Sequence, residues 1–296
     1  MTSTVYPASS LKRIRRTKAA LIDLKESLFK IVAENKPMTV RQLFYQMVSR
    51  QLIDKTEKQY DTVGRLATQM RRSGELPYSW LADSTRWMRK PNSHGSLEGF
   101  LTEQQTLYRR DLWQDQDAYV EVWLEKDALA GVLVEATQYW DVPLMVCRGY
   151  ASLSFLHSAA GKIRDVNKPT FLYYFGDCDP SGRDIPRAVE TALREMAPGA
   201  DITFEVVAVT DQQIIDFNLP TRPTKNTDSR SKNFEGESVE VDALPPRELI
   251  RICRNCIEQH IDDDVLARHT IVENAERQTL TTIVGNMTRG NSHVGD

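Results

Sequence analysis

An unbroken apolar run that ends in acidic residues constrains this chain more than any other feature. Residues 171–175 are all apolar or aromatic, and Gly-Asp-Cys-Asp follows them directly at 176–179. Such a run is typical of a strand buried on both faces, as in a parallel sheet. Pro180 and Gly182 then indicate a turn, and we expect a helix at 184–196.

Two further strands and helices precede this run. Residues 119–124 and 142–147 are apolar enough for buried strands, while 126–138 and 152–164 have their apolar residues at helical spacing. A further strand is expected at 202–209. The alternation of strands and helices predicts an α/β fold whose mainly parallel sheet is flanked by helices.

Carboxylates stand directly at the end of two of these strands. Glu125 follows the first strand, and Asp177 and Asp179 follow the third. Sites in open α/β sheets lie beyond the carboxyl ends of the strands, so the three side chains would converge if these strands are neighbours. Three such carboxylates repel one another, and Mg²⁺ prefers oxygen ligands. The pattern favours a metal site, and an ordinary Asp-rich loop is the alternative.

Three short motifs, in their order and spacing, resemble a known family. Glu125-Lys126 follows one strand, Gly149-Tyr150 forms a turn, and Asp-x-Asp-Pro-x-Gly follows a later strand. They resemble the Toprim domain, most of all that of the A subunit of topoisomerase VI and the related meiotic double-strand-break proteins. The resemblance implies a site for Mg²⁺, with Mn²⁺ as the alternative ion. Glu125, Asp177 and Asp179 would bind the metal, and Glu125 would also handle a proton.

The resemblance extends to Arg-Gln-Leu-Phe-Tyr at 41–45. In that family an Arg-acid-apolar-Tyr-Tyr helix ends on the catalytic tyrosine, and Tyr45 falls on that position. Here Gln42 replaces the acid and Phe44 the first tyrosine. A helical wheel groups Tyr45 with Arg41 and Ser49, so we expect an exposed hydroxyl whose phenolate Arg41 could stabilise. A tyrosine that merely flanks the core is the alternative.

Charge is divided unevenly along the chain. Residues 1–90 hold 18 Lys and Arg against 8 Asp and Glu, a balance of +10, while the remainder holds 20 against 33, a balance of −13. Such asymmetry favours an N-terminal part that binds nucleic acid. Basic helices that are merely solvated are the alternative.

The N-terminal part has the pattern of a winged helix-turn-helix. Helices are expected at 17–35, 40–50 and 57–73, and a wing or hairpin at 76–86. The third helix carries four basic residues suited to DNA contacts, namely Lys58, Arg65, Arg71 and Arg72.

The domain organisation follows from these patterns. We expect a basic winged-helix DNA-binding domain at 1–90, a connector at 91–117, and a Toprim domain with C-terminal helices at 118–296. There is no run of 18 apolar residues and no secretory pattern at the N-terminus, so we expect a cytoplasmic protein without a membrane partner.

The expected activity is Mg²⁺-dependent cleavage of double-stranded DNA by transesterification, with Tyr45 as the nucleophile. In the family that this chain resembles, the tyrosine and the metal site meet across a homodimer, so we expect a dimer. A topoisomerase (an isomerase) would also need a separate ATPase subunit, because the chain has no G-x-x-x-x-G-K-[ST] motif. Two alternatives remain: a Toprim nuclease that uses metal-activated water, and a non-catalytic DNA-binding Toprim protein.

Overall fold

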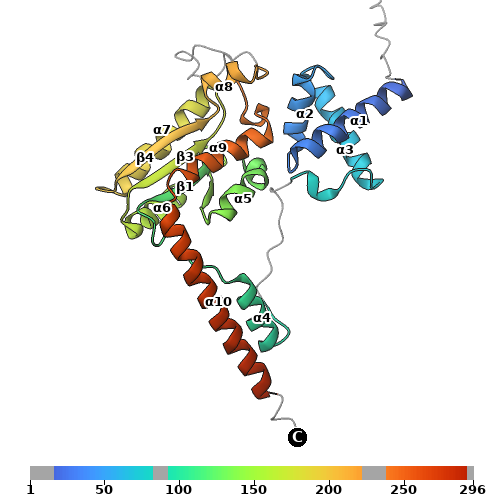
Figure 1. Cartoon of the computed structure of the whole chain (residues 1–296). Coiled ribbons are helices and arrows are strands. Elements are labelled where there is room, and N and C mark those ends of the chain that lie inside the picture. Colours follow the sequence, from blue (N-terminus) through green and yellow to red (C-terminus); the bar gives the residue numbers. More distant parts are fainter. Residues whose placement is uncertain (1–16, 83–92, 222–237, 292–296) are drawn as a thin grey trace, which may run out of the picture.

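A computed structural model describes residues 17–82, 93–221 and 238–291. Figure 1 shows three parts: an N-terminal helical unit, a central sheet with helices on both faces, and a projecting arm of two helices. The predicted boundary between the first domain and the connector falls in 83–92, outside the described residues.

The N-terminal unit consists of three helices, as expected. They are α1 (Lys18–Asn35), α2 (Val40–Ser49) and α3 (Glu57–Arg72), and each begins after a threonine whose hydroxyl accepts a backbone N–H. Thr39 does this as part of a full capping box with Gln42. Their apolar faces pack into one core, which includes Leu28, Leu43 and Val63, all fully buried.

The predicted wing takes a different form in its described part. Residues Tyr78–Trp80 form one turn of 3-10 helix (η1), and Leu81 makes a single bridge to Met38. Residues 83–86 of the expected wing lie outside the described residues. Within 76–82 the chain therefore turns back without forming a strand pair.

The central sheet has four strands, all parallel. They are β1 (Tyr119–Leu124), β2 (Leu144–Val146), β3 (Thr170–Phe175) and β4 (Ile202–Ala208), in the order β2-β1-β3-β4. The expectation that the first and third strands are neighbours is confirmed. Leu124 lies opposite Phe175, so the two strands end level with each other.

Helices cover both faces of this sheet (Figure 1). One face packs on α6 (Leu153–Val166) and α7 (Pro180–Met196) through a cluster that includes Trp123 and Tyr174. The other packs on α5 (Ala130–Tyr139) and α9 (Pro246–Glu258). Both faces are buried, which explains why β3 is apolar or aromatic from Phe171 onward and why β1 is apolar or aromatic except for the buried Glu121.

One predicted boundary is wrong. The helix after β3 was expected to begin at residue 184, but α7 begins at Pro180. Asp179 caps it, and a proline in the first turn costs nothing because its missing N–H would be unpaired there. Gly182 consequently lies inside the helix instead of in a turn.

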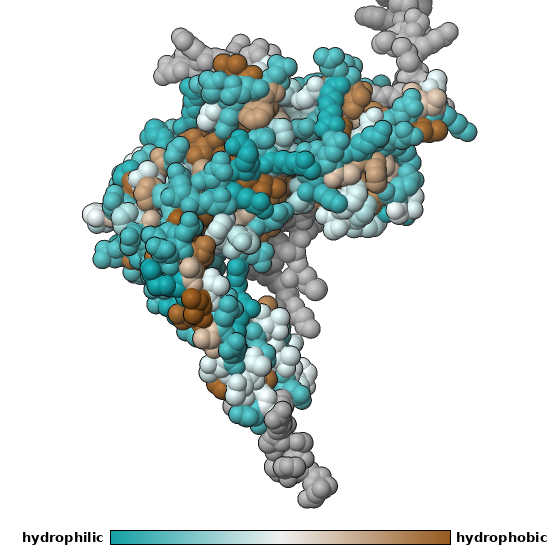
Figure 2. All heavy atoms as spheres, in the orientation of Figure 1, coloured by the Kyte–Doolittle hydropathy of each residue, from teal (hydrophilic) through white to brown (hydrophobic). Residues whose placement is uncertain are grey.

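The described part of the predicted connector contributes one helix to the arm. Within it, α4 (Leu97–Leu107) packs along the final helix α10 (Asp263–Asn291), with Tyr108 Oη donating to Glu276 Oε2 at 2.6 Å. In Figure 2 the arm is narrow and apolar patches interrupt its hydrophilic surface. Leu97 and Ile271 are among its exposed apolar side chains.

Candidate functional site

Glu125 and Asp177 meet at the carboxyl edge of the sheet. The strand pairing continues one step past β1, since Glu125 N–H donates to the Phe175 carbonyl at 2.9 Å. The Glu125 side chain then turns toward the end of β3, where its Oε2 accepts the Asp177 N–H at 3.0 Å. The convergence expected from the order of the strands therefore holds for these two residues.

Glu125 is held in a protonation range useful for acid–base chemistry. Burial, and then the negative charge of Asp177, raise its pKa to about 7, while the hydrogen bond from Asp177 N–H opposes the rise. A carboxyl group with a pKa near neutral can both accept and release a proton at physiological pH.

Asp177 is oriented from two sides. Its Oδ1 accepts the Val241 N–H at 2.9 Å and forms an ion pair with Lys126 Nζ at 3.0 Å. Burial raises the pKa of Asp177, whereas the Lys126 charge and the Val241 bond counteract that rise. The carboxylate is thus fixed in place before any ligand arrives.

Asp179 has a structural role in addition to the predicted one. Its Oδ1 accepts the Gly182 N–H at 2.7 Å and so caps α7. At Gly182, a β-carbon would collide with the carbonyl oxygen of Asp177, so only glycine allows the helix to start this close to the strand end. One oxygen of Asp179 is therefore committed to the helix.

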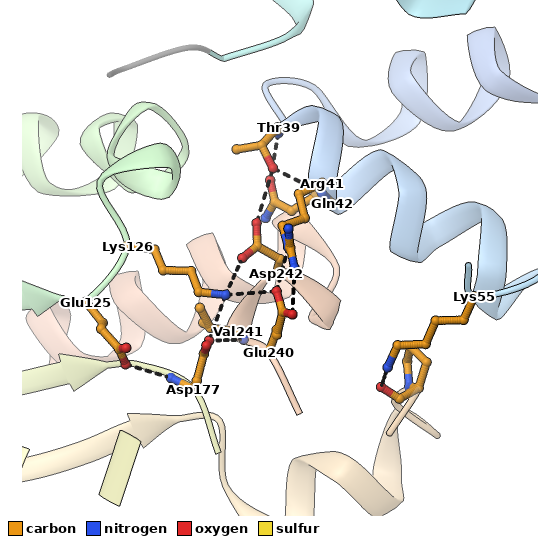
Figure 3. A network of polar contacts seen from close by, with 11 residues as sticks. Thr39, Arg41, Gln42, Lys55, Glu125, Lys126, Asp177, Glu240, Val241 and Asp242 are labelled. Atoms are coloured by element: carbon orange, nitrogen blue, oxygen red, sulfur yellow. Dashed lines mark hydrogen bonds and ion pairs between the residues drawn. The ribbon is translucent and has the colours of Figure 1, made fainter. Parts of the chain in front are cut away.

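Lys126, Glu240 and Asp242 complete the candidate site. The sequence points to Lys126 only as part of the Glu-Lys motif, and it does not single out Glu240 or Asp242. Lys126 Nζ lies 3.1 Å from Glu240 Oε2 and 2.9 Å from Asp242 Oδ2, in addition to its contact with Asp177 (Figure 3). Apolar and acidic residues alternate at 239–242, and this pattern is the signal from which Glu240 and Asp242 could have been found. It indicates a half-buried strand and says nothing of where that strand lies.

The helix α2 reaches this edge through Arg41. Its guanidinium donates to Glu240 from Nε at 2.5 Å and from Nη2 at 2.6 Å (Figure 3). Burial alone would raise the pKa of Glu240, but the bonds and charges of Arg41 and Lys126 outweigh it and lower that pKa to about 2. Thr39 Oγ1 also donates to Asp242 Oδ1, at 3.4 Å.

The expectation that Tyr45 exposes its hydroxyl is wrong. The residue is only 2 % exposed, because the face of α2 that carries Arg41 packs against the turn η4 (Val241–Ala243) while the opposite face packs in the helical core. Burial, and then the charge of Glu240, raise the pKa of Tyr45 to about 12, although Arg41 opposes this. The helical wheel correctly placed Tyr45 on the same face of α2 as Arg41. It could not show that residues 241–243 cover this face.

Whether these residues suit Mg²⁺ depends on their chemistry and on their present contacts. The donors are all carboxylate oxygens, as a hard cation requires. Beside them, Tyr174 Oη is buried without a hydrogen-bond partner among the described residues. Gly176 leaves room for this ring and for Glu125, because a β-carbon at that position would lie 2.5 Å from the Tyr174 ring edge and 2.7 Å from Glu125 Oε2. The described residues present no ready group of three acidic, His or Cys side chains for a metal. The donor chemistry fits Mg²⁺, and a cation bound to Asp177 would have as its neighbour the Lys126 ammonium, which lies 3.0 Å from that carboxylate.

The basic residues predicted to bind DNA divide into two groups on α3. Lys58, Arg65 and Arg72 are exposed and spaced seven residues apart, so they share one face of the helix. Arg71 is half-buried, with its guanidinium 4.6 Å from the ring centroid of Tyr78. Its position on the helix differs from that of the other three.

Less than half of the positive balance of residues 1–90 lies in the described residues. Residues 17–82 hold 11 Lys and Arg against 7 Asp and Glu, a balance of +4. The remaining +6 of residues 1–90 falls in 1–16 and 83–90, outside the described residues. The exposed face of α3 is thus one contributor to the positive balance.

Comparison with known proteins adds no assignment. Neither the models of protein families nor the curated protein sequences give a match to this chain. Within the described ranges, no helix has both the length and the apolar composition needed to cross a membrane.

Proposed function

We propose that this protein binds double-stranded DNA and cleaves its backbone at the carboxyl edge of the sheet, with Mg²⁺ or Mn²⁺ as cofactor. The observation that carries the proposal is the contact between Glu125 and Asp177 at the level ends of two adjacent parallel strands. A Toprim-like metal site is the interpretation that best accounts for it, given the motifs that these residues share with that domain.

The chain's own residues would divide the work. Glu125 and Asp177, together with Asp179 at the start of α7, would hold the cation. When bound, the cation stabilises negative charge on the phosphate and lowers the pKa of water. Glu125, whose pKa of about 7 suits proton transfer, would accept the proton of the attacking nucleophile.

Water is the nucleophile that the geometry favours. Tyr45 is 2 % exposed and its pKa is raised to about 12, so its phenolate is scarce at neutral pH. Arg41, the residue proposed to stabilise a phenolate, has its guanidinium engaged by Glu240. Hydrolysis by metal-activated water therefore becomes the leading proposal.

Transesterification by Tyr45 remains a second candidate because of one contact. The helix that carries Tyr45 packs at the acidic edge of its own chain, through Arg41 and Glu240. A rearrangement of α2 could bring the phenol to the metal site without a second subunit. A homodimer and a separate ATPase subunit remain proposals tied to this topoisomerase-like reading.

One experiment separates these readings. Supercoiled plasmid is incubated with the protein and Mg²⁺ or Mn²⁺, quenched with detergent, and analysed with and without protease. Water-based cleavage predicts free ends and full activity in Tyr45→Phe, whereas transesterification predicts protein-linked ends that this variant abolishes.

The carboxylates need their own variants in the same assay. Glu125→Gln and Asp177→Asn should abolish cleavage, and Glu135→Gln serves as the matched control because Glu135 lies away from the site in an exposed pair with Arg254. Undiminished cleavage by the double variant of Glu125 and Asp177 would refute the proposed site. If the parent protein binds DNA but cuts nothing, the non-catalytic reading replaces it.

A further inference from the structure

Lys126 occupies the centre of the acidic cluster. Its ammonium lies 3.0 Å from Asp177, 3.1 Å from Glu240 and 2.9 Å from Asp242, measured to one carboxylate oxygen of each. All three carboxylates are buried or nearly so, whereas the Lys126 side chain is 23 % exposed. One lysine therefore contacts three carboxylates from two distant segments.

The position of this ammonium is restricted by the backbone. Lys126 follows Glu125 directly, so its Cα is anchored where β1 ends, and the side chain extends across the site to residues 240–242 (Figure 3). Arg41 neutralises part of Glu240, whereas Asp177 and Asp242 form no ion pair with another cation among the described residues. Lys126 is thus the principal counter-charge of Asp177.

A divalent cation at Asp177 would meet this ammonium at short range. Like charges a few ångströms apart in a partly buried site repel strongly, so both cannot remain on the same carboxylate. The metal must either displace Lys126 or bind more weakly because of it. Asp177 would keep its orientation in either case, because the Val241 N–H also holds it, at 2.9 Å.

We propose that Lys126 is a tethered counter-cation that competes with the divalent cation for Asp177. The proposal rests on the metal site of the proposed function and adds a determinant of its affinity. In the absence of metal the lysine keeps the carboxylates together, and in its presence the ammonium retreats toward Glu240 and Asp242. Removing the lysine charge should therefore strengthen metal binding, which is the opposite of what a supporting ligand would do.

The test is Mn²⁺ binding by the full chain without DNA, measured by isothermal titration calorimetry. Lys126→Met should lower the dissociation constant for Mn²⁺ by on the order of tenfold, because one positive charge leaves the site. Lys126→Arg retains the charge and should bind as weakly as the parent. Lys25→Met removes a lysine that pairs with Glu75 on the surface, and should change nothing.

A second pair of variants locates the effect. In Lys126→Met/Asp177→Asn the gain should disappear, and a gain that persists there would place the Mn²⁺ elsewhere and overturn the proposal. Affinity that is unchanged, weaker or undetectable in Lys126→Met would overturn it as well. If that variant does not fold, Lys126→Met/Asp242→Asn is compared with Asp242→Asn alone, since each substitution removes one of two opposite charges.

The outcome is separable from that of the plasmid assay. A protein that cuts no DNA, but in which Lys126→Met binds Mn²⁺ more tightly, would refute the nuclease proposal and retain the competition. Metal-dependent cleavage with the same Mn²⁺ affinity in the parent and in Lys126→Met would support the nuclease proposal and refute the competition between Lys126 and the metal.

Discussion

Arg41 and Glu240, 199 residues apart in the sequence, form two short hydrogen bonds that join the N-terminal helical unit to the acidic edge of the sheet. The pair is bidentate, so it fixes the orientation of α2 as well as its distance. Lys126 shares the same carboxylate. A network of ion pairs, from Arg41 through Glu240 and Lys126, therefore connects the N-terminal unit to the strand ends of the sheet.

Removing one end of this connection should destabilise the protein. Arg41→Gln deprives Glu240, which is 4 % exposed, of its bidentate partner, although Lys126 still pairs with it. We expect a loss of roughly 1–3 kcal/mol in the free energy of unfolding, because the guanidinium itself is partly exposed. Urea denaturation measures this. Arg50→Gln, which breaks the exposed pair with Glu34, should cost less than about 1 kcal/mol.

Gly182 should tolerate no side chain. In Gly182→Ala the new β-carbon meets the Asp177 carbonyl oxygen, so α7 or the 177–179 loop must shift and the proposed metal site with it. We expect a loss of about 2 kcal/mol or more and no cleavage. Gly64→Ala is the matched helical control, because a β-carbon there would meet Val40 Cγ1 at 3.9 Å, an ordinary van der Waals contact. Alanine also favours a helix interior over glycine by about 1 kcal/mol. Equal stability of the two variants would argue against the close approach.

Stability without metal should depend on the protonation of Glu125. Its pKa is raised to about 7, so the folded chain holds the proton more tightly than the unfolded chain does. Ionisation of the buried Glu125 therefore lowers the free energy of unfolding progressively between about pH 4.5 and pH 7, and the loss stays constant above about pH 7. In EDTA, Glu125→Gln should therefore be more stable than the parent at pH 8, by up to about 3 kcal/mol, with the gap closing toward pH 4.5. A gap independent of pH would contradict the raised pKa.

DNA binding should distinguish the two groups of basic residues on α3. Glutamine at Lys58, Arg65 and Arg72 together should weaken binding to duplex DNA and reduce its salt dependence, since each phosphate contact releases counterions. Arg71→Gln should have a smaller effect, because Arg71 packs on Tyr78. Fluorescence anisotropy over a series of salt concentrations measures both. An equal effect of Arg71→Gln would mean that the exposed face of α3 does not define the contact.

The hydroxyl of Tyr174 offers a test of the environment beside Glu125. It is buried and makes no hydrogen bond to a described residue, so Tyr174→Phe removes a desolvated polar group without opening a cavity. The free energy of unfolding should stay the same or rise by up to about 1 kcal/mol. A loss of more than 1 kcal/mol in thermal or urea denaturation would show that the hydroxyl has a partner in solution.

The local pattern of the sequence was sufficient for the strands, most helices and the meeting of Glu125 with Asp177. Apolar periodicity reflects which faces are buried, and in a parallel sheet the strand ends share an edge whatever the loops do. The start of α7 was missed because Pro180 and Gly182 favour a turn in isolation, whereas the capping bond of Asp179 favours the helix. Two local preferences competed there, and the cap decided the outcome.

Only the tertiary structure decided what surrounds these carboxylates. Lys126 reaches Glu240 and Asp242 across more than a hundred residues of sequence, and no local pattern records which distant segment will neutralise a charge. The burial of Tyr45 has the same cause: the helix α2 determines which face carries the phenol, but the docking of that face on 241–243 determines whether solvent reaches it. Periodicity is a property of one element, whereas charge pairing and exposure are properties of two elements in contact.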